Sequence, residues 1–236
     1  MKYILLATSL ILLCTACRQK SNTYNQWDHY GGSKENIHYS SLKQIDTTNV
    51  TQLQVAWLYH TGDADTVHKS QIQCNPIMID SVLYGTTAQM KLFAIDAASG
   101  KEKWVFNPFD SLHGNKGSFF VLNNCRGVAY WGDGDKDKRI FYTAGSNLFC
   151  IDVATGQPVN SFGNSGKIDL HDGLERNVQD LFVTATSPGI VYKDVIIMGT
   201  RVDEGPSAAP GHIRAYDVRT GQQRWIFHTI PRQIWL

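Results

Sequence analysis

A short repeat constrains the fold of this chain more than any other feature. The clearest copy runs from Ala94 to Trp104, a second runs from Ala215 to Trp225, and a partial copy runs from Cys150 to Asn160. Each copy places an Asp, then a Ser or Thr three residues later, then a Gly, between two runs with alternating apolar residues. The Asp can accept hydrogen bonds across a turn, and the Gly supplies the positive φ that such a hairpin needs. Each copy therefore predicts a strand, a tight turn and a second strand.

The spacing of the copies predicts the architecture. The aspartates are 56 residues apart from Asp96 to Asp152 and 65 apart from Asp152 to Asp217, which suits one four-stranded sheet plus a variable loop per copy. Strand-like runs fill the intervals, at Ser81–Thr86, Arg139–Thr143 and Ile190–Thr200. We predict an all-β fold, a β-propeller of four-stranded blades, in which the small residue and the Trp of each copy pack blade against blade.

The composition supports this fold and limits the partners. Six Trp, 10 Tyr, 10 Phe and 20 Gly with only 7 Pro are typical of short strands joined by glycine turns. The pattern of a helix is confined to the N-terminus and Asn49–Leu53. The 22 basic and 21 acidic residues give a net charge of +1 and form no basic stripe, so nucleic acid is not expected as a partner.

The first 17 residues differ from the rest of the chain. A lysine precedes an apolar stretch, Tyr3–Leu13, that is shorter than the roughly 20 residues a transmembrane helix needs. Small residues directly before Cys17 resemble the bacterial lipobox, although Cys14 stands where that motif prefers Leu. We predict a lipoprotein-type signal peptide over residues 1–17, lipidation of Cys17, and a membrane-anchored location in the periplasm or cell envelope. An ordinary cleaved signal is the alternative, and it also implies export.

Two other patterns are weak signals of a metal site or a disulfide. Cys74, Cys125 and Cys150 form no C-x-x-C pair and have no zinc-like spacing, so we expect isolated buried cysteines. The alternating aspartates of Asp133–Lys138 resemble the start of an EF-hand loop, but the Gly and Glu positions of that loop hold other residues. We interpret this segment as a charged hairpin turn.

Further segments carry a resemblance to one family in the same order as in that family. They are Trp27–Gly32, His38–Leu42, Ala56–Asp63 and Asn124–Trp131, which are similar to W-x-x-Y-G, R-Y-S-P-L, A-W-x-x-x-T-G-D and N-R-G-V-A-Y-W. Together with the repeat, which resembles a tryptophan-docking motif, they resemble the pyrroloquinoline quinone (PQQ) dehydrogenases. The membrane-associated quinoprotein glucose dehydrogenases look most similar.

The resemblance implies an eight-bladed propeller that is larger than this chain. Eight blades of about 50 residues each would be needed to close the ring. The likeness extends from about Gln26 to Thr229, whereas Pro231–Leu236 no longer follow the family. We therefore expect residues 25–236 to be the N-terminal part of an incomplete propeller, from a truncated or frameshifted reading frame.

The resemblance also assigns cofactor-binding residues. Arg126 falls where the family pairs an arginine with a PQQ carboxylate, a role that suits the planar guanidinium fork. Gln73 falls where relatives often have Glu near the quinone edge, and its amide can still donate and accept hydrogen bonds. Thr186 falls where a side chain can hydrogen-bond the cofactor. The alternatives are a surface arginine and an ordinary strand threonine without cofactor contact.

Metal ligands are expected from the same resemblance. Asp203 and Glu204 fall where the family supplies calcium ligands, and hard oxygen ligands suit Ca²⁺. A solvated acidic loop is the alternative. The family's general-base Asp comes from a later blade, so no catalytic residue is expected in this chain.

The sequence thus predicts part of a PQQ- and calcium-dependent dehydrogenase that oxidises an aldose such as glucose. Such an enzyme passes electrons to a membrane quinone or cytochrome c, and we expect the present chain alone to be inactive. Two alternatives stay open. One is a non-catalytic β-propeller lipoprotein of the outer-membrane assembly type, and the other is an inactive remnant.

Overall fold

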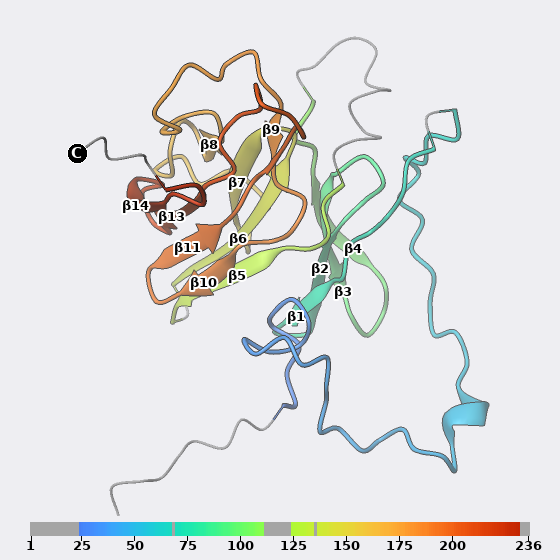
Figure 1. Cartoon of the computed structure of the whole chain (residues 1–236). Coiled ribbons are helices and arrows are strands. Elements are labelled where there is room, and N and C mark those ends of the chain that lie inside the picture. The colour runs from blue at the N-terminus through green and yellow to red at the C-terminus, as the bar shows by residue number, and fades with distance from the viewer. Residues whose placement is uncertain (1–23, 68, 111–123, 135, 232–236) are drawn as a thin grey trace, which may run out of the picture.

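The computed structural model describes residues 24–67, 69–110, 124–134 and 136–231, and their strands form three four-stranded antiparallel sheets (Figure 1). Blade A comprises β1 (Ile77–Ile79), β2 (Val82–Thr86), β3 (Leu92–Asp96) and β4 (Glu102–Phe106). Blade B comprises β5 (Ala129–Asp133), β6 (Asp137–Ala144), β7 (Asn147–Asp152) and β8 (Lys167–Asp169). Blade C comprises β10 (Ile190–Tyr192), β11 (Val195–Met198), β13 (Ile213–Asp217) and β14 (Gln223–Phe227). A separate pair joins β9 (Val183–Thr184) to β12 (Arg201–Val202).

Within each blade the strands are neighbours in chain order, as expected of a propeller blade. The predicted four-stranded blades are therefore confirmed. The run Ile190–Thr200 is a hairpin rather than one strand, because the chain reverses at Lys193, whose φ is 52°. The helical signal at Asn49–Leu53 corresponds to one short 3₁₀ helix, η1 (Val50–Gln52).

The repeated turns have the predicted chemistry. In blade A the Asp96 carboxylate accepts hydrogen bonds from the Ser99 N–H at 2.9 Å and from the Ser99 hydroxyl at 2.7 Å. The following Gly100 has φ of +70° and donates its N–H to the Asp96 carbonyl. The same contacts recur at Asp152, Thr155 and Gly156 and at Asp217, Thr220 and Gly221. In blades A and C the motif is thus the hairpin that joins the last two strands, whereas in blade B the turn leads to a bridge between Ile151 and Pro158 and β8 follows later in the chain.

Tryptophan docking joins blade A to blade B. The Trp104 ring lies against Gly156 so closely that a Cβ there would be 2.5 Å from ring atom Cδ2. The Trp104 indole also donates to the Val153 carbonyl at 3.1 Å. Trp57, which precedes blade A, contacts the blade A turn in the same way, through Gly100 and the Ala97 carbonyl. The predicted blade-to-blade packing of the repeat Trp is thus confirmed between blades A and B.

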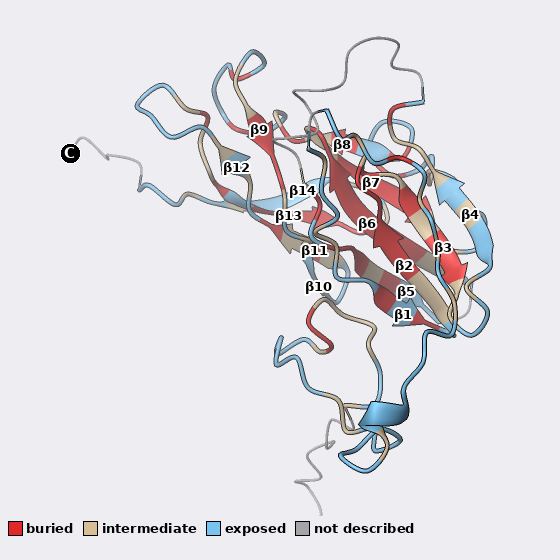
Figure 2. Cartoon of the chain, turned by 90° about the vertical axis from the view of Figure 1, so that its right-hand side faces the viewer, coloured by how far each residue is buried: buried red, intermediate tan, exposed pale blue. Residues whose placement is uncertain are grey.

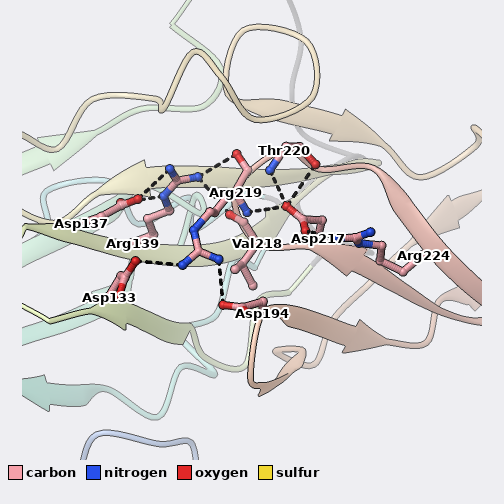
Figure 3. A network of polar contacts seen from close by, with 9 residues as sticks. All are labelled: Asp133, Asp137, Arg139, Asp194, Asp217, Val218, Arg219, Thr220 and Arg224. Carbon is pink, nitrogen blue, oxygen red and sulfur yellow. Dashed lines mark hydrogen bonds and ion pairs between the residues drawn. The ribbon is translucent and has the colours of Figure 1, made fainter.

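The joint between blades B and C has Asn160 where the repeat has Trp, and an arginine makes the equivalent hydrogen bond. Arg139 Nη1 donates to the Val218 carbonyl at 2.9 Å, the carbonyl that follows the turn Asp as Ala97 and Val153 do. It also donates to the Arg219 carbonyl at 2.9 Å, while the rest of the guanidinium pairs with Asp137 (Figure 3). The Arg139 side chain is only 8% exposed, so these bonds are shielded from water.

A second arginine lies at the solvent side of the same joint. The Arg219 guanidinium bridges Asp133 at 2.9 Å and Asp194 at 2.8 Å, and it lies 4.5 Å from the centre of the Trp131 ring (Figure 3). Asp133 and Asp137 are paired at the end of the β5–β6 hairpin. The charged hairpin turn predicted at this segment is therefore confirmed.

The hydrophobic core lies between neighbouring blades. On β6, Ile140 and Tyr142 pack with blade A residues, whereas Phe141 packs with blade C residues, because side chains alternate along a strand. Figure 2 shows buried residues on the middle strands of the sheets and exposed residues along β4. The three blades are thus held by two interblade cores and by the joints at their turns.

The Asp217 turn predicts an acid-dependent loss of stability. Burial alone would raise the pKa of Asp217, but hydrogen bonds from Thr220, Arg224 and the Arg219 N–H outweigh it and lower the pKa from 3.8 to about 2. A group with a lowered folded-state pKa stabilises the fold above its unfolded pKa, and this contribution is lost as the pH falls from about 4 to about 2. Urea unfolding should therefore show that the difference in unfolding free energy between wild type and Asp217→Asn becomes smaller as the pH falls from about 4 to about 2. A gap that is constant with pH would contradict the expectation.

Candidate functional site

Three loops lie side by side at the inner edge of the blades. Each loop leads toward the first strand of its blade, and the first strands β5 and β10 are in contact, so this edge is where the blades converge. The Asn75 N–H donates to the Arg126 carbonyl at 2.8 Å, and the Arg126 N–H donates to the Thr186 carbonyl at 2.8 Å. We call Gln73, Arg126 and Thr186, with the backbone that links them, the inner row. The structure thus places the three residues predicted to bind a cofactor on adjacent loops.

Arg126 lies in the middle of the inner row. Its side chain is exposed, and within the described ranges its guanidinium makes no hydrogen bond or ion pair. Other arginines of the blades are engaged, as Arg139 and Arg219 show. An unpaired guanidinium flanked by polar side chains fits a planar anion such as a carboxylate.

The two flanking residues offer further polar groups. Gln73 is half-buried, and its amide donates to the Gln71 side-chain carbonyl at 3.0 Å. Thr186 is half-buried, and its hydroxyl has no partner in the part of the chain that the structure describes. The row therefore presents one cation, one amide and one free hydroxyl.

Threonines from the preceding blade hold the inner row, and the sequence analysis missed them. The Thr86 hydroxyl, at the end of β2, donates to the Cys125 carbonyl directly before Arg126. The Thr143 hydroxyl, near the end of β6, donates to the Ala185 carbonyl directly before Thr186. Thr200 follows the third such strand at the same spacing, which is the signal that could have revealed these residues.

Of the three described cysteines, Cys125 and Cys150 are buried and Cys74 is half-buried. Burial raises the pKa of the Cys74 thiol and raises the pKa of Cys125 to about 11. Burial likewise raises the pKa of Cys150, in β7, to about 12. All three are free thiols, as expected, but only Cys125 and Cys150 are fully buried.

Asp203 and Glu204 follow β12 and are both exposed. The pairing of Val202 with Val183 places this loop beyond the end of β9 that lies away from Thr186. Among the residues with described positions, no group of three or more potential metal ligands is present. The structure therefore does not bring the two predicted metal ligands together with the inner row.

Two predicted N-terminal features fall outside the described residues. They are the signal peptide over residues 1–17 and the lipidation site at Cys17. Across the segments with described structure, no helix has the length and hydrophobicity to cross a membrane.

Comparison with known proteins agrees with this geometry. A family model described as "Glucose/ethanol/alcohol dehydrogenase, beta-propeller domain", of the PQQ type, matches residues 27–235. Quinoprotein glucose dehydrogenase A of Acinetobacter calcoaceticus is 34% identical over 228 residues, which cover 87% of this chain and 28% of that protein. The glycerol dehydrogenase large subunit of Gluconobacter oxydans is 31% identical and is covered to the same 28%.

A solved structure supports the same fold. The quinohemoprotein alcohol dehydrogenase of Pseudomonas putida HK5 superimposes with a TM-score of 0.69 at 26% identity, over 88% of this chain and 27% of that one. The chain thus spans little more than a quarter of the relatives it matches. From the family match, the identity to quinoprotein dehydrogenases and the shared blades, the chain belongs to the PQQ-dependent glucose, ethanol and alcohol dehydrogenase family and forms part of its β-propeller domain.

Proposed function

We propose that this chain supplies one side of a PQQ site in an enzyme that oxidises the CH–OH group of a sugar or alcohol. The observation that carries the proposal is the Arg126 guanidinium in the middle of the inner row, which is exposed and has no partner among the described residues. The family membership supports it, since the relatives include glucose and glycerol dehydrogenases.

Each row residue has a distinct task in the proposed site. Arg126 binds a carboxylate of PQQ through two parallel N–H bonds, while its own backbone is held on both sides by neighbouring loops. The Thr186 hydroxyl donates to an oxygen of the cofactor, and the Gln73 amide lies at its edge without adding charge. Bound PQQ would supply the two-electron acceptor, so these residues bind and orient rather than transfer protons.

Only two side chains, Asp203 and Glu204, are proposed as ligands of a metal ion. Ca²⁺ takes six to eight oxygen ligands, and Asp203 and Glu204 provide two exposed carboxylates without a third ligand group in the described ranges. The described residues therefore do not form a metal site by themselves. We keep both carboxylates as proposed ligands of Ca²⁺ and derive no step of the reaction through the ion.

We propose an aldose such as glucose as substrate, with electrons passing to a membrane quinone or cytochrome c, because quinoprotein glucose dehydrogenases are among the matching relatives. We also propose export to the periplasm or cell envelope with an anchor at Cys17, on the strength of the N-terminal motif.

Cofactor binding tests the proposal directly. Titration of the purified chain with PQQ, followed by PQQ absorbance and tryptophan quenching, should show saturable binding that Arg126→Leu weakens at least tenfold. The reason is the loss of a charge-assisted pair, which contributes about 1.5–3 kcal/mol.

A matched variant controls for net charge. Lys103→Met removes one positive charge from the outer strand β4 and should leave PQQ affinity within twofold of wild type. Equal weakening by both variants would mean that PQQ is attracted only by overall charge, and the proposed role of Arg126 would be wrong.

A further inference from the structure

A cavity of about 640 Å³ lies at the outer edge of the joint between blades B and C. The outer strands β8 and β14 both contribute to its wall, so it lies on the side of the sheets opposite to the inner row. It is the joint without a docking tryptophan, where the Gly163 N–H donates to the Thr220 carbonyl and the backbone of Gly163 covers Gly221. The volume falls in the range of about 300–1,000 Å³ that is typical of small-molecule sites.

Tyr216 provides the first indication of a ligand. It lines the cavity, is only 2% exposed, and its buried hydroxyl has no hydrogen-bond partner in the described part of the chain. Burial raises the pKa of Tyr216 to about 12, so the hydroxyl stays protonated and can both donate and accept. A buried hydroxyl without a partner is unfavourable in a folded protein unless another molecule supplies one.

The other polar groups of the wall point to the same kind of molecule. The side chains of Asn147, Asp172 and Gln223 also line the cavity and make no hydrogen bond within the described ranges. Amide groups present donors and acceptors together, which suits hydroxyl groups that do the same.

The charges of the wall disfavour an anion. Asp169 and Asp172 line the cavity together with one Lys167, whose ammonium lies 6.0 Å from the centre of the Phe149 ring. Asp169 is already paired with His171, and the buried Arg214 guanidinium donates to the Asp172 carbonyl. The nearby charges therefore nearly balance, which favours an uncharged ligand over an anion.

We propose that this cavity binds a neutral polyhydroxylated molecule, a sugar or polyol, through the amides of Asn147 and Gln223, and that binding opens the wall enough to reach the Tyr216 hydroxyl, which has almost no accessible surface in the free chain. The site contains none of the inner-row residues and does not depend on the proposed PQQ function. It would give the propeller a second carbohydrate-binding position, at its rim rather than at its centre.

Binding of simple probes tests this proposal. Ligand-observed NMR with D-glucose and glycerol, without PQQ and in the presence of a chelator, should show binding to the wild-type chain. Tyr216→Phe removes only the hydroxyl, so it should weaken binding at least tenfold while the melting temperature stays the same or rises. A purely structural role of Tyr216 would not produce this split between affinity and stability.

The chain offers a matched control in Tyr142→Phe. Tyr142 also has a buried hydroxyl without a partner in the described residues, but it lies in β6 away from the cavity. We expect this variant to bind the probes as the wild type does. Failure of both neutral probes, binding of gluconate or choline alone, or unchanged affinity in Tyr216→Phe would each overturn the proposal. PQQ titration of the same samples reports separately on the inner row.

Discussion

Replacement of Gly156 by Ala is expected to lower the free energy of unfolding by about 3 kcal/mol. Gly156 has φ of +70°, a conformation that costs an L residue about 1–2 kcal/mol. The added Cβ would also lie 2.5 Å from ring atom Cδ2 of Trp104, so the indole must move and its hydrogen bond to the Val153 carbonyl is lost. Urea unfolding monitored by tryptophan fluorescence measures both the destabilisation and the displaced ring.

The control for backbone strain alone is Gly134→Ala. Gly134 has a similar φ of +64°, but nothing lies within 4 Å of the position its Cβ would take. We expect a loss of about 1 kcal/mol there. Equal losses in the two variants would show that tryptophan docking contributes little to the joint.

Replacement of Arg139 by Met is the second change with a large expected effect, again about 3 kcal/mol. The variant leaves the Val218 and Arg219 carbonyls and the Asp137 carboxylate without their shared donor. Because the Arg139 side chain is nearly buried, water cannot replace these bonds without opening the joint between blades B and C. The midpoint of urea unfolding should fall accordingly.

Arg219→Met provides the matched comparison at the same joint. Its side chain is 41% exposed and its ion pairs with Asp133 and Asp194 face solvent, so the loss should be much smaller than that of Arg139→Met. A loss as large as that of Arg139→Met would contradict the assignment of Arg139 as the replacement for the docking tryptophan.

The repeated hairpin was predictable because its chemistry is local. Asp96, Ser99 and Gly100 interact within five positions of one another, so their order in the sequence determines the turn. Arg139 was not predictable in this way, since it reaches a carbonyl 79 residues further along the chain. The docking of Trp57 was not predictable from the repeat, because Asn49 stands at the position where the repeat has its Asp.

The candidate site was predictable only where the family resemblance named residues. Gln73, Arg126 and Thr186 share no local pattern, and only the blade topology places their loops in one row. Asp203 and Glu204 were named by the same resemblance, but the strand register carries them away from that row. The Tyr216 hydroxyl has no sequence signal, since its lack of a partner depends on residues of two blades.

The threonine contacts behind the inner row have a consequence for the order of assembly. Thr86 belongs to blade A yet fixes the loop that carries Arg126 of blade B, and Thr143 of blade B fixes the loop of Thr186. The inner-row loops of blades B and C are therefore each held by the preceding blade, so we expect the inner row to form only after these blades have docked. Thr200, whose buried hydroxyl has no partner in the described residues, occupies the corresponding place in blade C. Ligand binding at the inner row would therefore indicate that the neighbouring blades are correctly docked.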